Sequence, residues 1–319
     1  MASGKTVCVT GASGFIASWL VKLLLDRGYT VRGTVRNAEK SKHLLELPGA
    51  SERLTLVEAD LLKPGAFDSV VQGCDGVFHT ASPFLYRNFT DPDAQLIEPA
   101  VKGTLNVLES CAKARPKRVV LTSTEAAVSH TDKRIGADVV DESYFSDPDK
   151  CRREGDWYYL SKTLAELAAW DFAKQHNLDM VAILPVLVVG PVLQTSMNTS
   201  TEIVLELLNG TTQTITNQVV GWVGVKDVAM AHILTYEKPE AEGRYICSER
   251  MLHFGDAVAL LAKLYPQYHI VAKEDGSVPR DPGYNASSEK IKKLGLTFQP
   301  LEDVLRETVA SLKELKYLD

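Results

Sequence analysis

Residues 6–17 read TVCVTGASGFIA, and this stretch decides the fold. An apolar, β-rich run at Thr6–Thr10 ends in a glycine turn and continues into residues with helical spacing. Gly11 permits the tight bend, Gly14 lets the backbone approach a pyrophosphate, and Ala17 is small enough for the helix to pack closely on a sheet. The free N–H groups at the start of the helix then favour an anion. Taken alone, the glycine pattern also fits an ordinary strand–helix turn.

The order of elements after this turn indicates an α/β fold. Further strands are predicted at Tyr29–Val35, Leu54–Glu58, Gly76–His79, Arg118–Thr122 and Met180–Leu184. Helices are predicted at Ile16–Arg27, Ala94–Ala114 and Trp157–His176. Strands that alternate with helices lie parallel and are joined by crossover helices. We therefore expect a Rossmann-type doubly wound parallel sheet, whose first strand–helix turn binds a dinucleotide.

The sequence changes character after Pro185. Residues 190–216 are rich in Thr, Asn and Gly. The elements predicted beyond them are a short strand and a helix over Val223–Tyr236, a strand at Gly243–Cys247, and helices at Asp256–Leu264 and from Leu301 to about Leu315. We predict that residues 1–188 form a nucleotide-binding Rossmann domain, to which residues 219–238 also belong. Residues 189–319 are expected to form mainly a smaller substrate-binding lobe over the carboxyl ends of the strands, where ligands of such sheets bind.

The composition limits the classes of protein that fit. The 319 residues are 45% hydrophobic and 24% charged, as in a globular protein, and the net charge of −6 argues against a nucleic-acid binder. No stretch has the features of a secretory signal or a membrane span, so we predict a cytoplasmic protein without a nucleic-acid or membrane partner. The five cysteines form no CxxC pair, which indicates reduced thiols. No metal is expected, because no metal-like spacing links His79, His130, His232, His253 and His269.

The end of the second strand indicates which dinucleotide is bound. It reads GTVRN, residues 33–37, without the acid that usually bonds the ribose hydroxyls of NAD. Arg36 stands at that place, and Lys40 and Lys42 follow. A guanidinium with an ammonium suits an adenosine 2′-phosphate, so we predict NADP(H) as the cofactor. The alternative is that these cations are only the solvated start of a helix.

A tyrosine and a lysine carry the predicted chemistry. Tyr158 and Lys162 are four residues apart within WYYLSKT, which puts them on the same face of the predicted helix. The ammonium can then lower the phenol pKa from its reference value of about 10, so that Tyr158 acts as a general acid. Upstream, the strand ending in LTST, residues 121–124, offers a hydroxyl for the substrate carbonyl oxygen. The alternative is a core aromatic residue beside a surface lysine; Tyr159, with Thr163 four residues on, lacks such a partner.

These motifs together resemble an extended short-chain dehydrogenase/reductase, and more closely the plant branch of dihydroflavonol reductases, cinnamoyl-CoA reductases and related aldehyde reductases. The similar stretches are VTGASGFIASWLVKLLLDRGYTVRGTVR, GCDGVFHTASPF, RVVLTST, WYYLSKTLAE, LPVLVVGPVLQ and GRYICSE, from Val9 to about Glu249. The pattern KLGL at residues 293–296 also fits, so the resemblance covers nearly the whole chain.

The resemblance implies a role for each of several positions. The cofactor phosphates would be bound by Ser13, Phe15 and Ile16, the 2′-phosphate by Arg36 and Lys40, and the adenine would be bordered by Asp60 and Leu61. The nicotinamide would be lined by Thr80, Ala81 and Ser82 and packed by Pro185 and Val188, with Ser200 near the cofactor. The candidate substrate residues are apolar or aromatic, which suits a phenyl-bearing carbonyl compound: Phe84, Tyr86, Val128, Val186, Leu193, Met197 and Trp222. Each of these could equally pack in the core.

Two positions depart from the family pattern. The family usually has two serines where this chain has Ser123 and Thr124, and the second is the catalytic hydroxyl. Thr124 keeps the hydroxyl and adds a methyl group, and Ser123 is the second candidate. Glu125 follows where the family has a small or apolar residue; it is either a surface residue or a charge that repels anionic substrates.

The substrate stays open among several reactions. The first hypothesis is NADPH-dependent reduction of a hydrophobic aldehyde or ketone, and the second is reduction of a cinnamoyl-CoA thioester. Dihydroflavonol reductases carry Asn or Asp where this chain has Ser129, and cinnamoyl-CoA reductases resemble NWYCYGK where it reads DWYYLSK. A non-catalytic NADP sensor is the alternative from another class, but it would typically have lost Tyr158 or Lys162. We expect a small hydrophobic carbonyl substrate and a monomer or homodimer.

Overall fold

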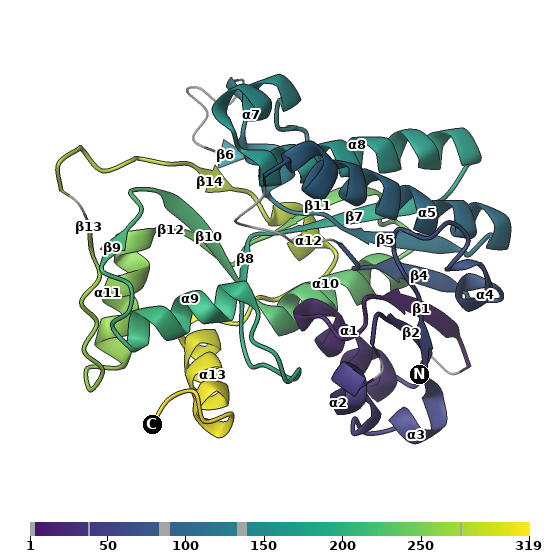
Figure 1. Cartoon of the computed structure of the whole chain (residues 1–319), viewed down its shortest axis with the longest axis horizontal. Coiled ribbons are helices and arrows are strands. Elements are labelled where there is room, and N and C mark those ends of the chain that lie inside the picture. Colours follow the sequence, from purple (N-terminus) through teal and green to yellow (C-terminus); the bar gives the residue numbers. More distant parts are fainter. Residues whose placement is uncertain (1–3, 38, 83–89, 133–138, 275) are drawn as a thin grey trace.

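The computed structural model describes residues 4–37, 39–82, 90–132, 139–274 and 276–319. Within them, parallel strands form a seven-stranded sheet in the order β11-β7-β5-β4-β1-β2-β3 (Figure 1). These strands are β1 Thr6–Thr10, β2 Thr30–Val35, β3 Leu54–Glu58, β4 Gly76–His79, β5 Arg118–Thr122, β7 Met180–Pro185 and β11 Gly243–Cys247. Because all of them are parallel, their carboxyl ends meet at one edge, and the predicted Rossmann-type sheet is confirmed.

Helices cover both faces of this sheet. One face carries α1 (Phe15–Asp26) and α10 (Val225–Glu237), which pack on each other. The other carries α5 (Glu98–Ala114) and α8 (Trp157–His176), as Figure 1 shows. Shorter helices join them: η1 Glu39–Ser41, α2 Lys42–Leu45, α3 Ala50–Arg53, α4 Asp68–Val71, η2 Asp93–Ile97, α6 Ala126–Ser129 and α7 Pro148–Glu154. Two separate core clusters lie on the two faces, which explains why the strands are apolar throughout instead of alternating.

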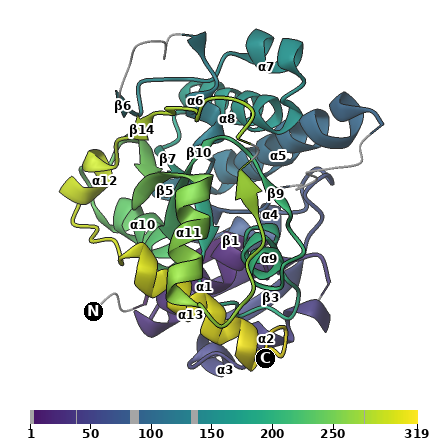
Figure 2. The same ribbon diagram turned by 90° about the vertical axis from the view of Figure 1, so that its left-hand side faces the viewer.

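The chain after β7 builds a second, smaller layer at the carboxyl edge (Figure 2). A three-stranded sheet in the order β12-β10-β8 shares its own apolar core with the helices around it. Its elements are β8 Leu187–Val189, α9 Thr199–Leu208, β10 Val219–Gly224, β12 Arg250–His253, α11 Phe254–Leu264 and α13 Leu301–Glu314. The short pair β9 Thr214–Ile215 with β13 Lys273–Glu274 follows the same part of the chain. A second short pair, β6 Val139–Val140 with β14 Asn285–Ala286, packs against the core of the large sheet, as does α12 (Glu289–Lys293), which lies on β11.

The sequence predictions placed strand β11 correctly and did not include helix α9. Strand β11 pairs with β7 in the large sheet, although it lies beyond the boundary predicted at residue 188, because it satisfies the backbone groups along that side of β7. Helix α9 forms inside the segment that showed no helical pattern among its Thr and Asn residues, and it buries Val204, Leu207 and Leu208. Helix α10 lies within residues 219–238 and packs on α1. The assignment of residues 219–238 to the nucleotide-binding domain stays a prediction.

Two further predictions concern the whole chain. All five cysteines are buried free thiols, which confirms the expected absence of a disulfide framework. Among the described residues, no helix combines the length and the apolarity that crossing a bilayer requires.

Candidate active site

The turn after β1 has the geometry of a phosphate site. Gly11 has a φ of +64°, and a Cβ there would lie 3.0 Å from the Cα of Ala81, so only glycine fits without strain. Gly14 is the N-cap of α1, where no side chain caps the helix and no acid stands in the first turn. The N–H groups of this helix start are therefore available to an anion, and the turn fits a dinucleotide pyrophosphate.

The predicted 2′-phosphate cations differ in their surroundings. Arg36 is exposed directly after β2. Lys42 pairs with Glu39 at 2.6 Å, and the side chain of Lys40 lies outside what the structure describes. Arg32 donates to the carbonyl oxygens of Val70 and Gln72 at 3.2 and 2.6 Å and is engaged away from this place. Arg36 is thus the described cation that fits a 2′-phosphate best.

The residues predicted to border the adenine follow β3 at the carboxyl edge. The Asp60 carboxylate accepts a hydrogen bond from the Leu62 N–H at 2.9 Å, which shapes the turn. The Leu61 side chain packs on Gly103 of α5, where a Cβ would lie only 2.6 Å from it, and the carbonyl of Leu61 accepts from Asn106 at 2.9 Å. Both residues are held at the edge where a cofactor on this sheet would bind.

The end of β4 is locked onto the end of β1 by Thr10. Its hydroxyl oxygen accepts from the N–H groups of Thr80 and Ala81 at 3.1 and 3.0 Å and lies 2.8 Å from His79 Nδ1. Burial, with the charge of Lys162 second, lowers the pKa of His79 to about 3, so this histidine is neutral. The predicted nicotinamide-side residues are therefore rigidly placed, and Ala81 and Ser82 line a small cavity that also contains Ser123 and Lys162.

The predicted catalytic residues come together between β5 and α8. Lys162 Nζ donates to the carbonyl of Thr122 at 3.4 Å, and Tyr158 lies one turn earlier on α8. Helix α6, which starts two residues after Thr124, packs against α8. Burial lowers the pKa of Lys162 to about 8, while the negative charge of Glu166 acts in the opposite direction. The ammonium is thus held in a partly dehydrated position beside the acid it is predicted to assist.

The two candidate hydroxyls have different partners. Ser123 is buried, and its hydroxyl donates to the Glu166 carboxylate at 2.5 Å. Thr124 is half-buried, and its hydroxyl oxygen accepts from the Ala126 N–H at 3.2 Å, which leaves the hydroxyl proton to be donated elsewhere. This arrangement favours Thr124 as the hydroxyl that contacts a substrate carbonyl.

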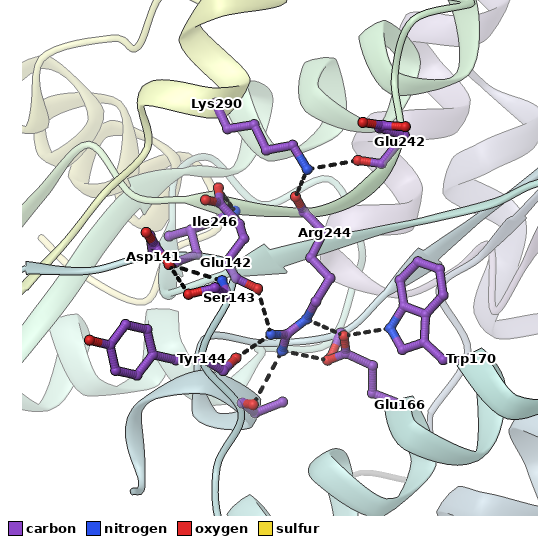
Figure 3. Close-up of polar contacts among 12 residues, drawn as sticks. Asp141, Glu142, Ser143, Tyr144, Glu166, Trp170, Glu242, Arg244, Ile246 and Lys290 are labelled. Carbon is purple, nitrogen blue, oxygen red and sulfur yellow. Dashed lines mark hydrogen bonds and ion pairs between the residues drawn. The ribbon is translucent and has the colours of Figure 1, made fainter. Parts of the chain in front are cut away.

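Sequence reasoning did not find the ion pair next to this site. Arg244 on β11 and Glu166 on α8 are both buried and pair through two hydrogen bonds, of 2.6 and 3.3 Å (Figure 3). Two signals were present in the sequence: Glu166 follows Lys162 by four residues, and Arg244 interrupts an apolar strand.

A family match accounts for this geometry. Residues 7–247 match the model described as the NAD dependent epimerase/dehydratase family. The chain belongs to this family. It is 56% identical to cinnamoyl-CoA reductase CAD2 of Medicago truncatula, over 98% of this chain and 97% of that protein. Two solved structures each match with a TM-score of 0.84: vestitone reductase from alfalfa (Medicago sativa), at 34% identity over 99% of this chain and 100% of that one, and yeast methylglyoxal/isovaleraldehyde reductase Gre2 complexed with NADPH, at 32% identity over 98% and 100%.

These similarities confirm the predicted family. The protein is an extended short-chain dehydrogenase/reductase, with the fold and the oxidoreductase class expected from its sequence motifs. A nicotinamide dinucleotide, NAD(P)(H), is the cofactor of this family. The phosphate turn and the ends of β3 and β4 described above fit such a group, which would supply the hydride.

The unusual Glu125 of this reductase is not a free surface charge. It accepts a hydrogen bond from the hydroxyl of Tyr284, which comes directly before β14. Burial, followed by the charge of Glu125, raises the pKa of Tyr284 well above its usual value. The carboxylate therefore ties the strand-end segment after β5 to the C-terminal layer.

The predicted substrate residues are in two kinds of surroundings. Val128 is fully buried, and Trp222 is 2% exposed and packs near Phe254 in the core of the smaller layer. Val186, Leu193 and Met197 are partly buried against core clusters, and Val188 accepts a hydrogen bond from Ser200 at 2.5 Å. In this structure the core-packing alternative describes Val128 and Trp222, and their contact with a substrate stays a prediction. Phe84 and Tyr86 lie outside the described residues.

One grouping of possible metal ligands lies near the site. Ligand atoms of His130, Glu154 and Asp156 lie within 4.8 Å of one another, a closeness that spacing in the sequence does not show. His130 Nε2 is 2.9 Å from Glu154 and 3.2 Å from Asp156, and the Lys150 ammonium also pairs with Glu154 at 2.9 Å. The same ammonium also contacts Asp132 at 2.9 Å, so these side chains belong to a wider network of charged groups, and the absence of a metal stays a prediction.

Proposed function

We propose that this protein reduces a cinnamoyl-CoA-type thioester to the aldehyde with NADPH. The observation that carries the proposal is the 56% identity, across nearly the whole of both chains, to a cinnamoyl-CoA reductase. The side chains that this reaction needs are also present: Tyr158 and Lys162 lie on one face of α8, and Thr124 lies just after β5. This reaction was the second hypothesis from the sequence, and the relative now favours it over simple aldehyde or ketone reduction.

The residues of the site divide the chemistry among them. Thr124 and Tyr158 donate hydrogen bonds to the thioester carbonyl oxygen, and Tyr158 transfers its proton there as the bound NADPH supplies the hydride. The Lys162 ammonium stabilises the phenolate that remains. The C–S bond of the resulting hemithioacetal would then break, its hydroxyl proton would go to sulfur, and aldehyde and CoA thiol would leave. Tyr158 would regain a proton from solvent, which supplies the one proton that each turnover consumes.

A side-by-side assay tests the substrate. Cinnamoyl-CoA, cinnamaldehyde and a dihydroflavonol are offered separately with NADPH, and NADPH oxidation, thiol release and the organic product are measured. We expect one thiol released per NADPH oxidised with the thioester. Turnover of only the aldehyde would establish the first hypothesis instead. Turnover of only the dihydroflavonol would favour a ketone reductase, which the similarity to vestitone reductase supports. NADPH binding without any turnover would identify a sensor.

The preference for NADPH rests on Arg36. Replacing Arg36 by Ala removes charge-assisted hydrogen bonds to the 2′-phosphate, worth about 1.5–3 kcal/mol, so KM for NADPH is expected to rise roughly 10–100-fold. KM for NADH should change little, because NADH has no phosphate there. Steady-state kinetics with both cofactors give the ratio of KM for NADPH to KM for NADH.

Arg32 on the same strand provides a matched control. Its guanidinium contacts carbonyl oxygens of the Val70–Gln72 region. Arg32→Ala should therefore leave the ratio of the two KM values unchanged. An unchanged ratio in Arg36→Ala would remove the physical basis for the NADPH preference.

A further inference from the structure

Three ionisable residues stand in one row along α8. Tyr158, Lys162 and Glu166 follow at four-residue steps, so they lie on the same face of the helix. Glu166 is 1% exposed and ends the row on the side away from the predicted acid. Its carboxylate is the charge that acts on Lys162 against the effect of burial.

We propose that Glu166, held by Arg244, is a positioning residue for the reduction, whose negative charge keeps Lys162 protonated beside Tyr158. The inference deepens the proposed function and rests on it for its catalytic meaning. It concerns two residues, Glu166 and Arg244, to which the sequence motifs assign no role in binding the cofactor or the substrate.

The carboxylate of Glu166 is fixed by four hydrogen bonds. Arg244 donates to both oxygens, and Trp170 donates to Oε1 at 3.0 Å (Figure 3). Ser123 donates to Oε2 at 2.5 Å. A carboxylate has about four lone-pair positions, so each one is used. These hydrogen bonds hold the carboxylate in one orientation.

Arg244 is fixed equally well. Its guanidinium uses all five N–H groups: two hydrogen bonds to Glu166 and three to the carbonyl oxygens of Glu142, Tyr144 and Ala127 (Figure 3). It also lies over the Phe145 ring, 3.7 Å from the ring centroid. Arg244 thus connects three parts of the chain to helix α8: strand β11, helix α6, and the segment that follows β6.

Glu166 acts on Lys162 through the electrostatic field of its carboxylate and not through a hydrogen bond. Its oxygens are occupied by other donors, while Lys162 Nζ donates to the carbonyl of Thr122, the neighbour of Ser123. Lys162 therefore keeps its remaining N–H groups for the cofactor ribose and the phenol. Direct pairing with the carboxylate would have withdrawn the ammonium from both.

The other groups that face Lys162 cannot replace this charge. From β4 comes His79, which is neutral because burial holds its pKa at about 3. From β5 come the carbonyl of Thr122 and the hydroxyl of Ser123, and from α5 comes the hydroxyl of Thr104. Within the described parts of the chain, Glu166 is the carboxylate beside this cavity.

Glu166→Gln removes the charge and keeps the shape. The pKa of Lys162 should then fall further, so the ammonium is lost at lower pH. We expect the basic limb of the kcat profile to move down by about one pH unit. A purely structural role would lower kcat equally at every pH. A basic limb that stays in place in the folded variant overturns the proposal.

A second measurement reads Lys162 without requiring turnover. NMR of protein with ¹³Cε-labelled lysine follows each ammonium through its titration, and Lys162→Arg assigns the resonance. The Lys162 midpoint should fall by about one pH unit in Glu166→Gln, and an unchanged midpoint contradicts the proposal. Failure of the proposed function is a separate result, namely a wild-type protein that reduces none of the substrates offered.

Further variants separate charge from folding. Glu166→Gln with Arg244→Met removes both charges of the pair, which protects the fold. The Lys162 midpoint should again fall, but less than in Glu166→Gln, because the positive charge of Arg244, which also disfavours the ammonium, is removed as well. Glu166→Asp keeps the charge and should keep the wild-type midpoint. Asp179→Asn is the matched control, because Asp179 pairs with Arg118 through hydrogen bonds of 2.9 and 3.0 Å at the amino ends of β5 and β7. A shift in that control as large as in Glu166→Gln would also overturn the proposal.

Discussion

Replacing Tyr158 by Phe is expected to lower turnover about 10²–10⁴-fold while NADPH still binds. Phenylalanine keeps the ring and removes the hydroxyl that we propose donates the proton, so only the chemical step should lose its acid. The measurement is kcat for the preferred substrate, together with NADPH affinity from a fluorescence titration.

The neighbouring tyrosine is a matched control. Tyr159 lies on another face of α8, with its ring centroid 5.4 Å from that of His130, and its carbonyl accepts from the Thr163 hydroxyl at 2.7 Å. Tyr159→Phe should retain most of the activity. Near-normal turnover in Tyr158→Phe, or an equal loss in both variants, would contradict the assignment of Tyr158 as the acid.

The second large effect is expected on stability. Arg244→Met leaves the Glu166 carboxylate buried without the arginine and removes one donor from each of three carbonyl oxygens, those of Glu142, Tyr144 and Ala127. Breaking a buried pair from one side costs about 3–5 kcal/mol of the free energy of unfolding. Urea denaturation of the variant and the wild type measures the loss.

Arg250, whose ion pairs are more exposed to solvent, provides the comparison for this loss of stability. Arg250 contacts Glu249 and Glu302 with 34% of its side chain exposed, and such pairs contribute about 0–1 kcal/mol. Arg250→Met should therefore destabilise the protein much less than Arg244→Met. Similar urea midpoints of unfolding for the two variants would mean that the Arg244–Glu166 pair does not stabilise the packing of β11 on α8.

Much of the fold could be predicted because its signals are local. The turn at residues 6–17 combines a strand end, glycines and a helix start within one short stretch. The apolar runs that become β3, β4 and β5 end where predicted, because each is bounded by charged or turn residues. Tyr158 and Lys162 could be proposed as a catalytic pair from the sequence because one helix fixes their spacing, and their roles stay a prediction.

The rest depends on contacts between distant segments. Glu166 and Arg244 are 78 residues apart, and nothing in either local sequence names the other. The choice of Thr124 over Ser123 depends on which hydroxyl faces Glu166, a matter of strand orientation. Helix α9 could not be predicted because its first residues are rich in Thr and Asn. Its buried residues Val204, Leu207 and Leu208 stabilise a helix only by packing in the core of the smaller layer.

The late position of β11 has a consequence for how the chain is made. During synthesis β7 is complete after residue 185, but its edge stays unpaired until residues 243–247 arrive. An apolar parallel strand with a free edge is prone to pair with other chains, so the nascent protein passes through a stage that favours aggregation. Strand β11 also carries Arg244, so helix α8 is linked to the sheet through the Arg244–Glu166 pair only after β11 has paired with β7.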